Sequence, residues 1–191
     1  ELNPDKLKQM YSKLFDDDKV FIHAHFGTND IEDIFAKLRY LIVGCDCKWV
    51  IVDHLHMLVS ASNEGDERRT IDMIMTRLRS LVEETGAGII LVSHLRRVEG
   101  NKGHENGISV SLSHLRGSNS IAQLSDCVIA LERDQQSTDD IESRTTRLRI
   151  LKSRYTGDVG LASSLLYDTE TGRLAEHFDS ELEILKEESP L

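Results

Sequence analysis

The chain has 191 residues, of which 39% are hydrophobic and two are proline, so one folded domain with a sizeable core is expected. The formal net charge of −10 excludes a generally basic protein that coats nucleic acid, but leaves room for a local basic track. No signal peptide is visible and no apolar run is long enough to cross a bilayer. We therefore predict a cytoplasmic protein with no membrane contact.

The first residue is Glu1 rather than Met, so we expect a piece of a longer protein, cut from its amino-terminal side. The three cysteines, Cys45, Cys47 and Cys127, form no disulfide framework. No second pair of Cys or His lies at matching spacing, so reduced thiols are favoured over a metal site.

The first part of the chain predicts helix, strand, helix and strand in turn. A helix is expected over Pro4–Phe15, because proline suits the first helical position, and a short strand over Val20–His23. Asn29 or Asp30 caps the next helix. The apolar run Trp49–Asp53 then predicts a buried strand. The apolar residues of the second helix recur at helical spacing, namely Ile31, Ile34, Phe35, Leu38, Leu41 and Ile42.

The middle of the chain continues this alternation. After a polar loop over Ser60–Asp66, an amphipathic helix is expected to end at Gly86, and Ile89–Val92 is the next buried strand. Arg96–Gly107 is a polar loop with three glycines, too long to be a mere connector. The apolar residues of the helix are Ile71, Ile74, Met75, Leu78, Leu81 and Val82.

The last part of the chain changes from helical to extended patterns. A short helix is expected over Ser118–Leu124, followed by a core strand over Cys127–Leu131. A meander or hairpins are expected from Arg147–Lys152, Leu161–Tyr167 and Leu174–Ala175. Together the elements predict an α/β fold, with a mostly parallel sheet flanked by helices and a C-terminal antiparallel extension. We assign residues 1–176 to the folded domain and 177–191 to an acidic, flexible tail.

Two of the apolar runs end abruptly in polar residues that suit a magnesium nucleotide. Asp53 closes one strand and Ser93-His94 closes another. The carboxyl ends of parallel strands form the ligand-binding edge of an α/β sheet. There Asp53 can hold Mg²⁺ and His94 can sense a terminal phosphate, a layout typical of RecA-like motors. An Asp that caps a loop amide and a structural His are the alternatives.

Basic residues in glycine-bearing segments favour contacts with phosphates. Arg96, Arg97 and Lys102 lie in the long loop, and Arg116-Gly117 follows it. Such loops let the backbone approach single-stranded nucleic acid closely, although a solvated surface loop is the alternative. Arg154 precedes a glycine turn, where it can serve as an arginine finger for a neighbouring subunit or form a strand-end salt bridge.

Taken together, these motifs resemble the helicase half of phage primase-helicases of the T-odd type. Those proteins belong to the DnaB-like hexameric replicative helicases of superfamily 4, and mitochondrial Twinkle is a more distant relative. The similarity extends from Phe21 to Leu174. It rests on Asp53-His54, SASNEGDERRTIDMIMTRLRSL, Ser93-His94-Leu95, LSHLRGSNSIAQLSDCVIALERDQQ and RILKSRYTGDVG.

The resemblance implies a RecA-like core and a role for several residues at the nucleotide. Asp53 matches the Walker B aspartate, which binds the metal, and His94 the phosphate sensor. Gln123 matches a glutamine near the γ-phosphate. Arg154 matches the arginine finger that reaches across the subunit boundary. Three further matches are cofactor contacts: Lys152 beside the finger, and Arg133 and Tyr167 as the pair that sandwiches the base.

The resemblance also implies the partners. Mg²⁺ with ATP or dTTP is the expected cofactor, and six or seven copies are expected to form a ring around single-stranded DNA. The acidic tail resembles the segment that recruits the replicative DNA polymerase. For a phage protein the location would be the host cytoplasm. The expected DNA contacts are Arg96, Arg97, Lys102, Arg116 and Gly117.

Some family features are missing from these 191 residues. The chain contains no GxxxxGK[ST] phosphate loop. The catalytic glutamate and the linker helix of the family are missing too, and both are expected upstream of these residues. Ala122 stands where a basic residue is expected in the family. The chain alone is therefore expected not to hydrolyse NTP. The alternatives are a RecA-type recombinase, a KaiC-like ATPase, or a truncated interaction module without catalytic activity.

Overall fold

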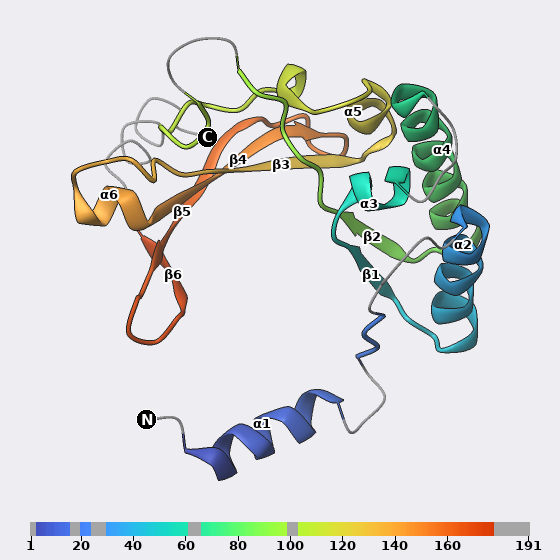
Figure 1. The fold of residues 1–191 in the computed structure, drawn as a ribbon, viewed down its shortest axis with the longest axis horizontal. Helices are drawn as coiled ribbons and strands as arrows, with labels where there is room; N and C mark the ends of the chain where they lie inside the picture. Colours follow the sequence, from blue (N-terminus) through green and yellow to red (C-terminus); the bar gives the residue numbers. More distant parts are fainter. Residues whose placement is uncertain (1–2, 16–19, 24–29, 61–65, 99–102, 178–191) are drawn as a thin grey trace. The chain divides into compact units, whose positions relative to one another are not determined.

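The computed structural model describes residues 3–15, 20–23, 30–60, 66–98 and 103–177. The chain divides into two compact units, Glu1–Ser93 and His94–Leu191. Figure 1 labels their helices and strands. None of the helices in the described ranges is both long and apolar enough to cross a membrane.

The described residues of the first unit form four α-helices and a pair of parallel strands. Strands β1 and β2 are in parallel register, with Trp49 opposite Gly88 and Val52 opposite Leu91. The elements in chain order are α1 (Pro4–Phe15), α2 (Ile31–Arg39), the π-helix η1 (Tyr40–Gly44), β1 (Trp49–Val52), α3 (Leu55–Ser60), α4 (Glu67–Thr85) and β2 (Gly88–Leu91).

Local signals in the sequence set the ends of the two main helices of this unit. The Asp30 carboxylate accepts the N–H of Glu32 at 3.2 Å and starts α2. The Asp66 carboxylate accepts two backbone N–H groups at the start of α4. Gly86 ends α4 in the left-handed conformation at φ 72°, where a side chain would be strained. The predicted helices are therefore confirmed, together with Asp30 as the cap of α2.

The core of the first unit lies between α2, α4 and one face of the strands. Its buried apolar side chains include Ile34, Phe35, Leu38, Val50, Leu55, Ile71, Ile74 and Leu78. On the rim, Arg77 of α4 makes two contacts with Glu32 of α2, at 2.5 and 2.8 Å, and its guanidinium lies 4.0 Å from the Phe35 ring centroid. A second pair, Arg39 with Glu84 at 2.5 Å, joins the same two helices.

Parts of the first unit differ from the prediction. Val20–His23 forms no strand, so that prediction is wrong. Helix α3 and the π-helix η1 were not predicted. The other face of β1 is exposed, with Trp49 and Ile51 at 70% and 69% relative exposure.

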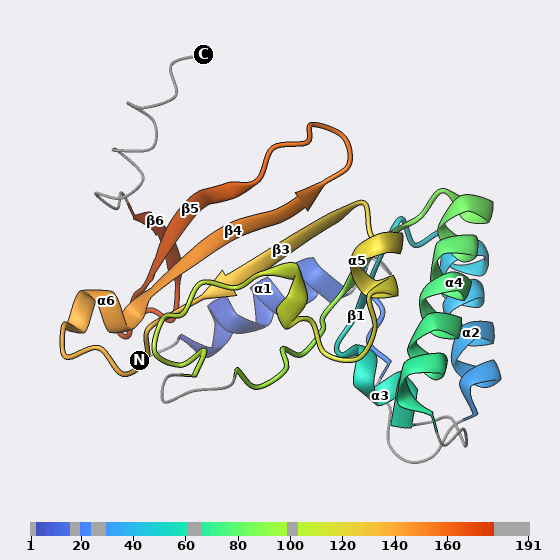
Figure 2. The ribbon, with the colours of Figure 1, turned by 90° about the horizontal axis from the view of Figure 1, so that it is seen from above.

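The second unit is built on an antiparallel sheet in the order β3-β4-β5-β6. Figure 2 shows β3, β4 and β5 side by side, with α6 at one end of them. The predicted antiparallel extension is present, and it includes β3, which was predicted as a core strand. The elements are η2 (Leu112–His114, a 3₁₀ turn), α5 (Ser120–Leu124), β3 (Cys127–Glu132), α6 (Asp140–Arg144), β4 (Thr145–Ser153), β5 (Gly160–Tyr167) and β6 (Leu174–His177).

The Glu32–Arg77 pair predicts acid-dependent stability of the first unit. The hydrogen bond from Arg77 holds the pKa of Glu32 below its ordinary value of 4.5. A carboxyl whose folded pKa is depressed stabilises the fold above its unfolded pKa, and this contribution is lost as the pH falls through the folded value. Glu32→Gln should therefore lower the unfolding temperature at pH 7, and the difference from wild type should shrink at pH 3.

The control is Glu83→Gln, which removes an exposed pair within α4 (Arg79–Glu83, 2.7 Å). Pairs of this kind contribute little, so its unfolding temperature should stay close to wild type at both pH values. Thermal unfolding followed by circular dichroism is the measurement. An equal loss for Glu32→Gln at pH 7 and pH 3 would contradict the prediction.

Candidate functional site

Asp53 directly follows β1, at the edge of the first unit where both parallel strands end. Val92 holds this turn, because its N–H donates to the Val52 carbonyl at 3.0 Å and its carbonyl accepts the N–H of Leu55 at 2.9 Å. Asp53 itself is exposed. Carboxylate oxygens are the ligands that Mg²⁺ prefers, so the position and chemistry of Asp53 fit a metal ligand.

An apolar groove of about 410 Å³ lies beside this edge. Phe21, Leu38, Ile51 and Met57 contribute to its lining, together with Asp53. A triphosphate needs cations and N–H donors rather than apolar side chains. Lys37 and His23 also line the groove, but most of its lining is apolar, so it suits an apolar group better than a phosphate chain.

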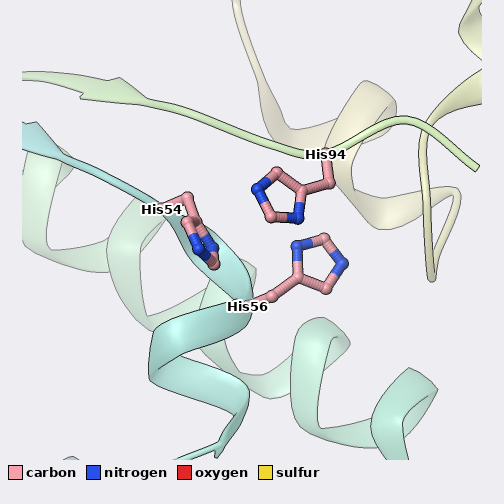
Figure 3. Close-up of side chains that lie close together, drawn as sticks. All are labelled: His54, His56 and His94. Carbon is pink, nitrogen blue, oxygen red and sulfur yellow. The ribbon is translucent and has the colours of Figure 1, made fainter.

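Two histidines come after Asp53, and Figure 3 shows their side chains. The ring centroids of His54 and His56 are 6.1 Å apart. His56 lies in α3 and is buried, and its Nε2 is 3.7 Å from the carboxylate of Glu67 at the start of α4. This contact lies where α3 packs against α4. Neither histidine was predicted as a site residue. For His56 the reason is that its position depends on helix α3, which was not predicted.

The second unit begins at His94, which Figure 3 labels on the segment after β2. Leu95 and Leu115 form an antiparallel bridge. On one side of it the Arg96 N–H donates to the His114 carbonyl at 2.8 Å, and on the other the Arg116 N–H donates to the His94 carbonyl at 3.2 Å. The structure thus brings the predicted sensor His94 together with the predicted DNA contacts Arg96 and Arg116.

The predicted DNA contacts are exposed where the structure describes them. Arg96, Arg97, Arg116 and Gly117 all have exposed side chains or backbone, and Gly117 has φ 105°, which a residue with a side chain rarely adopts. Lys102 lies outside the described residues.

Glu132 anchors the segment that follows the long loop to the sheet. Its side chain is 5% exposed and contacts Arg149 at 2.8 Å. The same carboxylate accepts the N–H of Val110 at 2.6 Å. A second anchor is the N–H of Gln135, which donates to the Glu105 carbonyl at 2.9 Å. The loop is therefore tied to the end of β3.

Lys152 caps the end of α5. Its ammonium lies at hydrogen-bond distance from the carbonyls of Ala122 (2.6 Å), Gln123 (3.2 Å) and Ser125 (2.8 Å). An ammonium has three donors, and the carbonyl end of a helix favours a cation. In this structure the three donors of Lys152 are therefore used by backbone carbonyls at the end of α5. The predicted contact between Lys152 and a nucleotide would require the ammonium to release at least one of these carbonyls.

Arg154 lies next to this helix end and is paired with Asp126. The two residues are joined by the Arg154 N–H to the Asp126 carbonyl at 2.8 Å and by Nη1 to the Asp126 carboxylate at 3.0 Å. Nη2 also donates to the Gln123 carbonyl at 3.2 Å. The alternative of a strand-end salt bridge is thus present, and 46% of the Arg154 side chain is still exposed.

Arg133 and Tyr167 lie at the opposite end of the antiparallel sheet. Cys127 pairs with Ser153 at the Arg154 end, whereas Arg133 follows the other end of β3. β3 has six residues, so the two ends are about 17 Å apart at the usual rise per residue. Arg133 Nε donates to the Ser143 carbonyl at 2.6 Å, and the Tyr167 carbonyl accepts from Arg144 at 3.2 Å. Helix α6 therefore holds both residues.

Comparison with known proteins identifies the family of the chain. A family model described as the DnaB-like helicase C-terminal domain matches residues 1–176. The chain belongs to this family. A relative in Enterobacteria phage T3, named DNA helicase/primase, is 40% identical over 169 residues, which cover 88% of this chain and 29% of the relative. This DnaB-like domain thus spans less than a third of that relative.

Among solved structures, the fold is similar to a KaiC-like protein of Pyrococcus horikoshii OT3. The TM-score is 0.58 at 12% sequence identity, over 93% of this chain and 72% of that protein. At this identity the likeness concerns the fold alone. It confirms the α/β, RecA-like class, and the family match confirms the resemblance to DnaB-like helicases.

The sequence analysis did not predict a role for two residues of the DnaB-like domain, Asp126 and Glu132. Asp126 contacts the predicted site residue Arg154, and Glu132 contacts the segment after the long loop. Both lie within the motif LSHLRGSNSIAQLSDCVIALERDQQ, in which the resemblance gives neither residue a role. Each contacts residues far along the chain, and no local spacing rule connects such residues. An acidic residue directly after the predicted apolar strand Cys127–Leu131 was the one signal that the sequence offered for Glu132.

The Glu132 contacts predict a large loss of stability when the carboxylate is removed. Glu132→Ala leaves the Val110 N–H and the Arg149 guanidinium without this partner, which should cost about 2–3 kcal/mol of unfolding free energy. Urea unfolding is the measurement. Glu176→Ala, which removes an exposed carboxylate of β6 in the same sheet, is the control and should change the free energy by less than about 0.5 kcal/mol. Similar losses in the two variants would contradict the structural role of Glu132.

Proposed function

We propose that this domain is part of a ring-shaped replicative DNA helicase. The ring couples NTP hydrolysis to translocation on single-stranded DNA and to unwinding of the duplex. The observation that carries the proposal is the exposed Asp53 at the carboxyl end of two parallel strands, in a chain that belongs to the DnaB-like family. A strand-terminal Asp in this place holds the metal of P-loop NTPases.

Mg²⁺ with ATP or dTTP is the proposed cofactor, and the metal supplies charge neutralisation at the phosphates. His94 is the proposed sensor of the terminal phosphate. Its carbonyl accepts the Arg116 N–H directly, so a displacement of His94 acts on a proposed DNA contact through one hydrogen bond. This contact supports coupling between nucleotide state and DNA grip.

Arg154 is the proposed arginine finger for the nucleotide of a neighbouring subunit. Its exposed guanidinium supports this role, since Arg can bind phosphate oxygens bidentately. At the other end of the sheet, Arg133 and Tyr167 offer a cation and a ring for stacking on a base. Gln123, whose backbone contacts both Lys152 and Arg154, is proposed to lie near the γ-phosphate.

We propose that six or seven copies close into the ring, as in the DnaB-like helicases that the chain resembles. Heterologous contacts between identical subunits form a ring when the rotation from one subunit to the next closes. The DNA contacts would face its channel: Arg96, Arg97, Lys102, Arg116 and Gly117. The acidic residues beyond 177 are proposed to recruit the replicative polymerase.

Two features support a motor that is larger than these residues. Parallel strands are usually covered on both faces, whereas Trp49 and Ile51 leave one face of β1 exposed in the described first unit. The sequence also lacks a GxxxxGK[ST] phosphate loop. We therefore propose that the 191-residue chain alone has no NTPase activity.

The test uses the full-length protein that contains this chain, with a forked DNA duplex, Mg²⁺ and NTP. We expect unwinding that depends on NTP. Asp53→Asn should abolish both unwinding and NTPase activity while single-stranded DNA binding persists. Asp46→Asn, an exposed carboxylate near β1, is the control and should keep both activities.

Two results would contradict the proposal. Filaments on single-stranded DNA without unwinding would favour a RecA-type recombinase. Robust NTPase activity of the isolated 191-residue chain would show that hydrolysis does not need a phosphate loop from elsewhere.

A further inference from the structure

We propose that Asp126 is a positioning residue for Arg154. The inference rests on the proposed function, which gives Arg154 a phosphate on the neighbouring subunit to act on. Asp126 would not touch the nucleotide. Its role would be to hold the guanidinium in the orientation that the neighbour requires.

The contacts between the two residues fix both the backbone and the side chain of Arg154. The backbone N–H donates to the Asp126 carbonyl at 2.8 Å, which sets where the side chain starts. The carboxylate contacts Nη1 at 3.0 Å, and the Gln123 carbonyl accepts from Nη2 at 3.2 Å. Two acceptors on different residues therefore hold the plane of the guanidinium.

The acceptors are themselves held in place. Lys152 contacts three carbonyls at the end of α5, including that of Gln123. Asp126 comes two residues after that helix and directly before β3. The side chain of Asp126 is 28% exposed, so the carboxylate is partly shielded from water, and its attraction to Arg154 is stronger than that of a fully exposed pair.

The geometry favours positioning over sequestration of the finger. A guanidinium has five N–H donors, and the contacts with Asp126 and Gln123 use Nη1 and Nη2 once each. Because 46% of the Arg154 side chain stays exposed, donors remain for a phosphate. A long side chain that is already oriented loses less freedom when it meets its target.

The experiment measures DNA-stimulated NTPase kinetics of the full-length ring. Asp126→Asn keeps the size of the side chain and removes its charge. We expect kcat to fall about 10-fold or more, since small misplacements of a catalytic group have effects of this size, with KM and single-stranded DNA affinity within about twofold of wild type. Asp126→Glu should recover part of the loss. Asp158→Asn, an exposed carboxylate in the same loop between β4 and β5 as Arg154, is the matched control and should keep wild-type kcat.

A double-mutant cycle separates positioning from a general structural role. Arg154→Ala should lower kcat by about 10³-fold, as expected for a finger, and adding Asp126→Asn to it should have no further effect. A further loss in the double variant, or a wild-type kcat for Asp126→Asn, would overturn the positioning role alone. A wild-type kcat for Arg154→Ala would overturn the finger itself and, with it, the role of Asp126.

Discussion

The hydrogen bonds that Val92 makes on both sides of the turn after β1 are the constraint on which the proposed metal site depends. Its N–H donates to the Val52 carbonyl and its carbonyl accepts the N–H of Leu55, so both sides of the turn that carries Asp53 are bound to the end of β2. β1 and β2 are only four residues long. Parallel pairing and these two bonds together therefore place a carboxylate where an α/β fold binds its ligand.

In the second unit the antiparallel ladder sets the spacing of the proposed nucleotide contacts. Arg154 lies at one end of β3 and β4, and Arg133 lies at the other. Each is held by a short helix beside it in space: the end of α5 with Asp126 at one end, and α6 at the other. Such fixed cations lose little freedom on binding, which suits contacts that must form and break in each cycle.

The sequence was sufficient where the decisive contacts are local. The ends of helices α2 and α4 are set by Asp30, Asp66 and Gly86, whose contacts are with neighbours within a few residues. The spacing of apolar residues located the strands. Val20–His23 was wrongly predicted as a strand, because a strand exists only if another strand pairs with it. The Asp126–Arg154 ion pair could not be predicted from the sequence for a similar reason, because these two residues are distant along the chain and meet only after β3 and β4 pair. The assigned roles of the site residues came from the family resemblance and stay predictions.

The central claim is that Asp53 of one subunit and Arg154 of its neighbour serve the same nucleotide. Mixed rings test it directly. Asp53→Asn subunits and Arg154→Ala subunits of the full-length protein are each expected to be inactive. When they are mixed, some interfaces combine an intact Asp53 with an intact Arg154, and NTPase activity should reappear. Mixed rings that assemble but stay inactive would contradict the account, because they would place both residues at a site within one subunit.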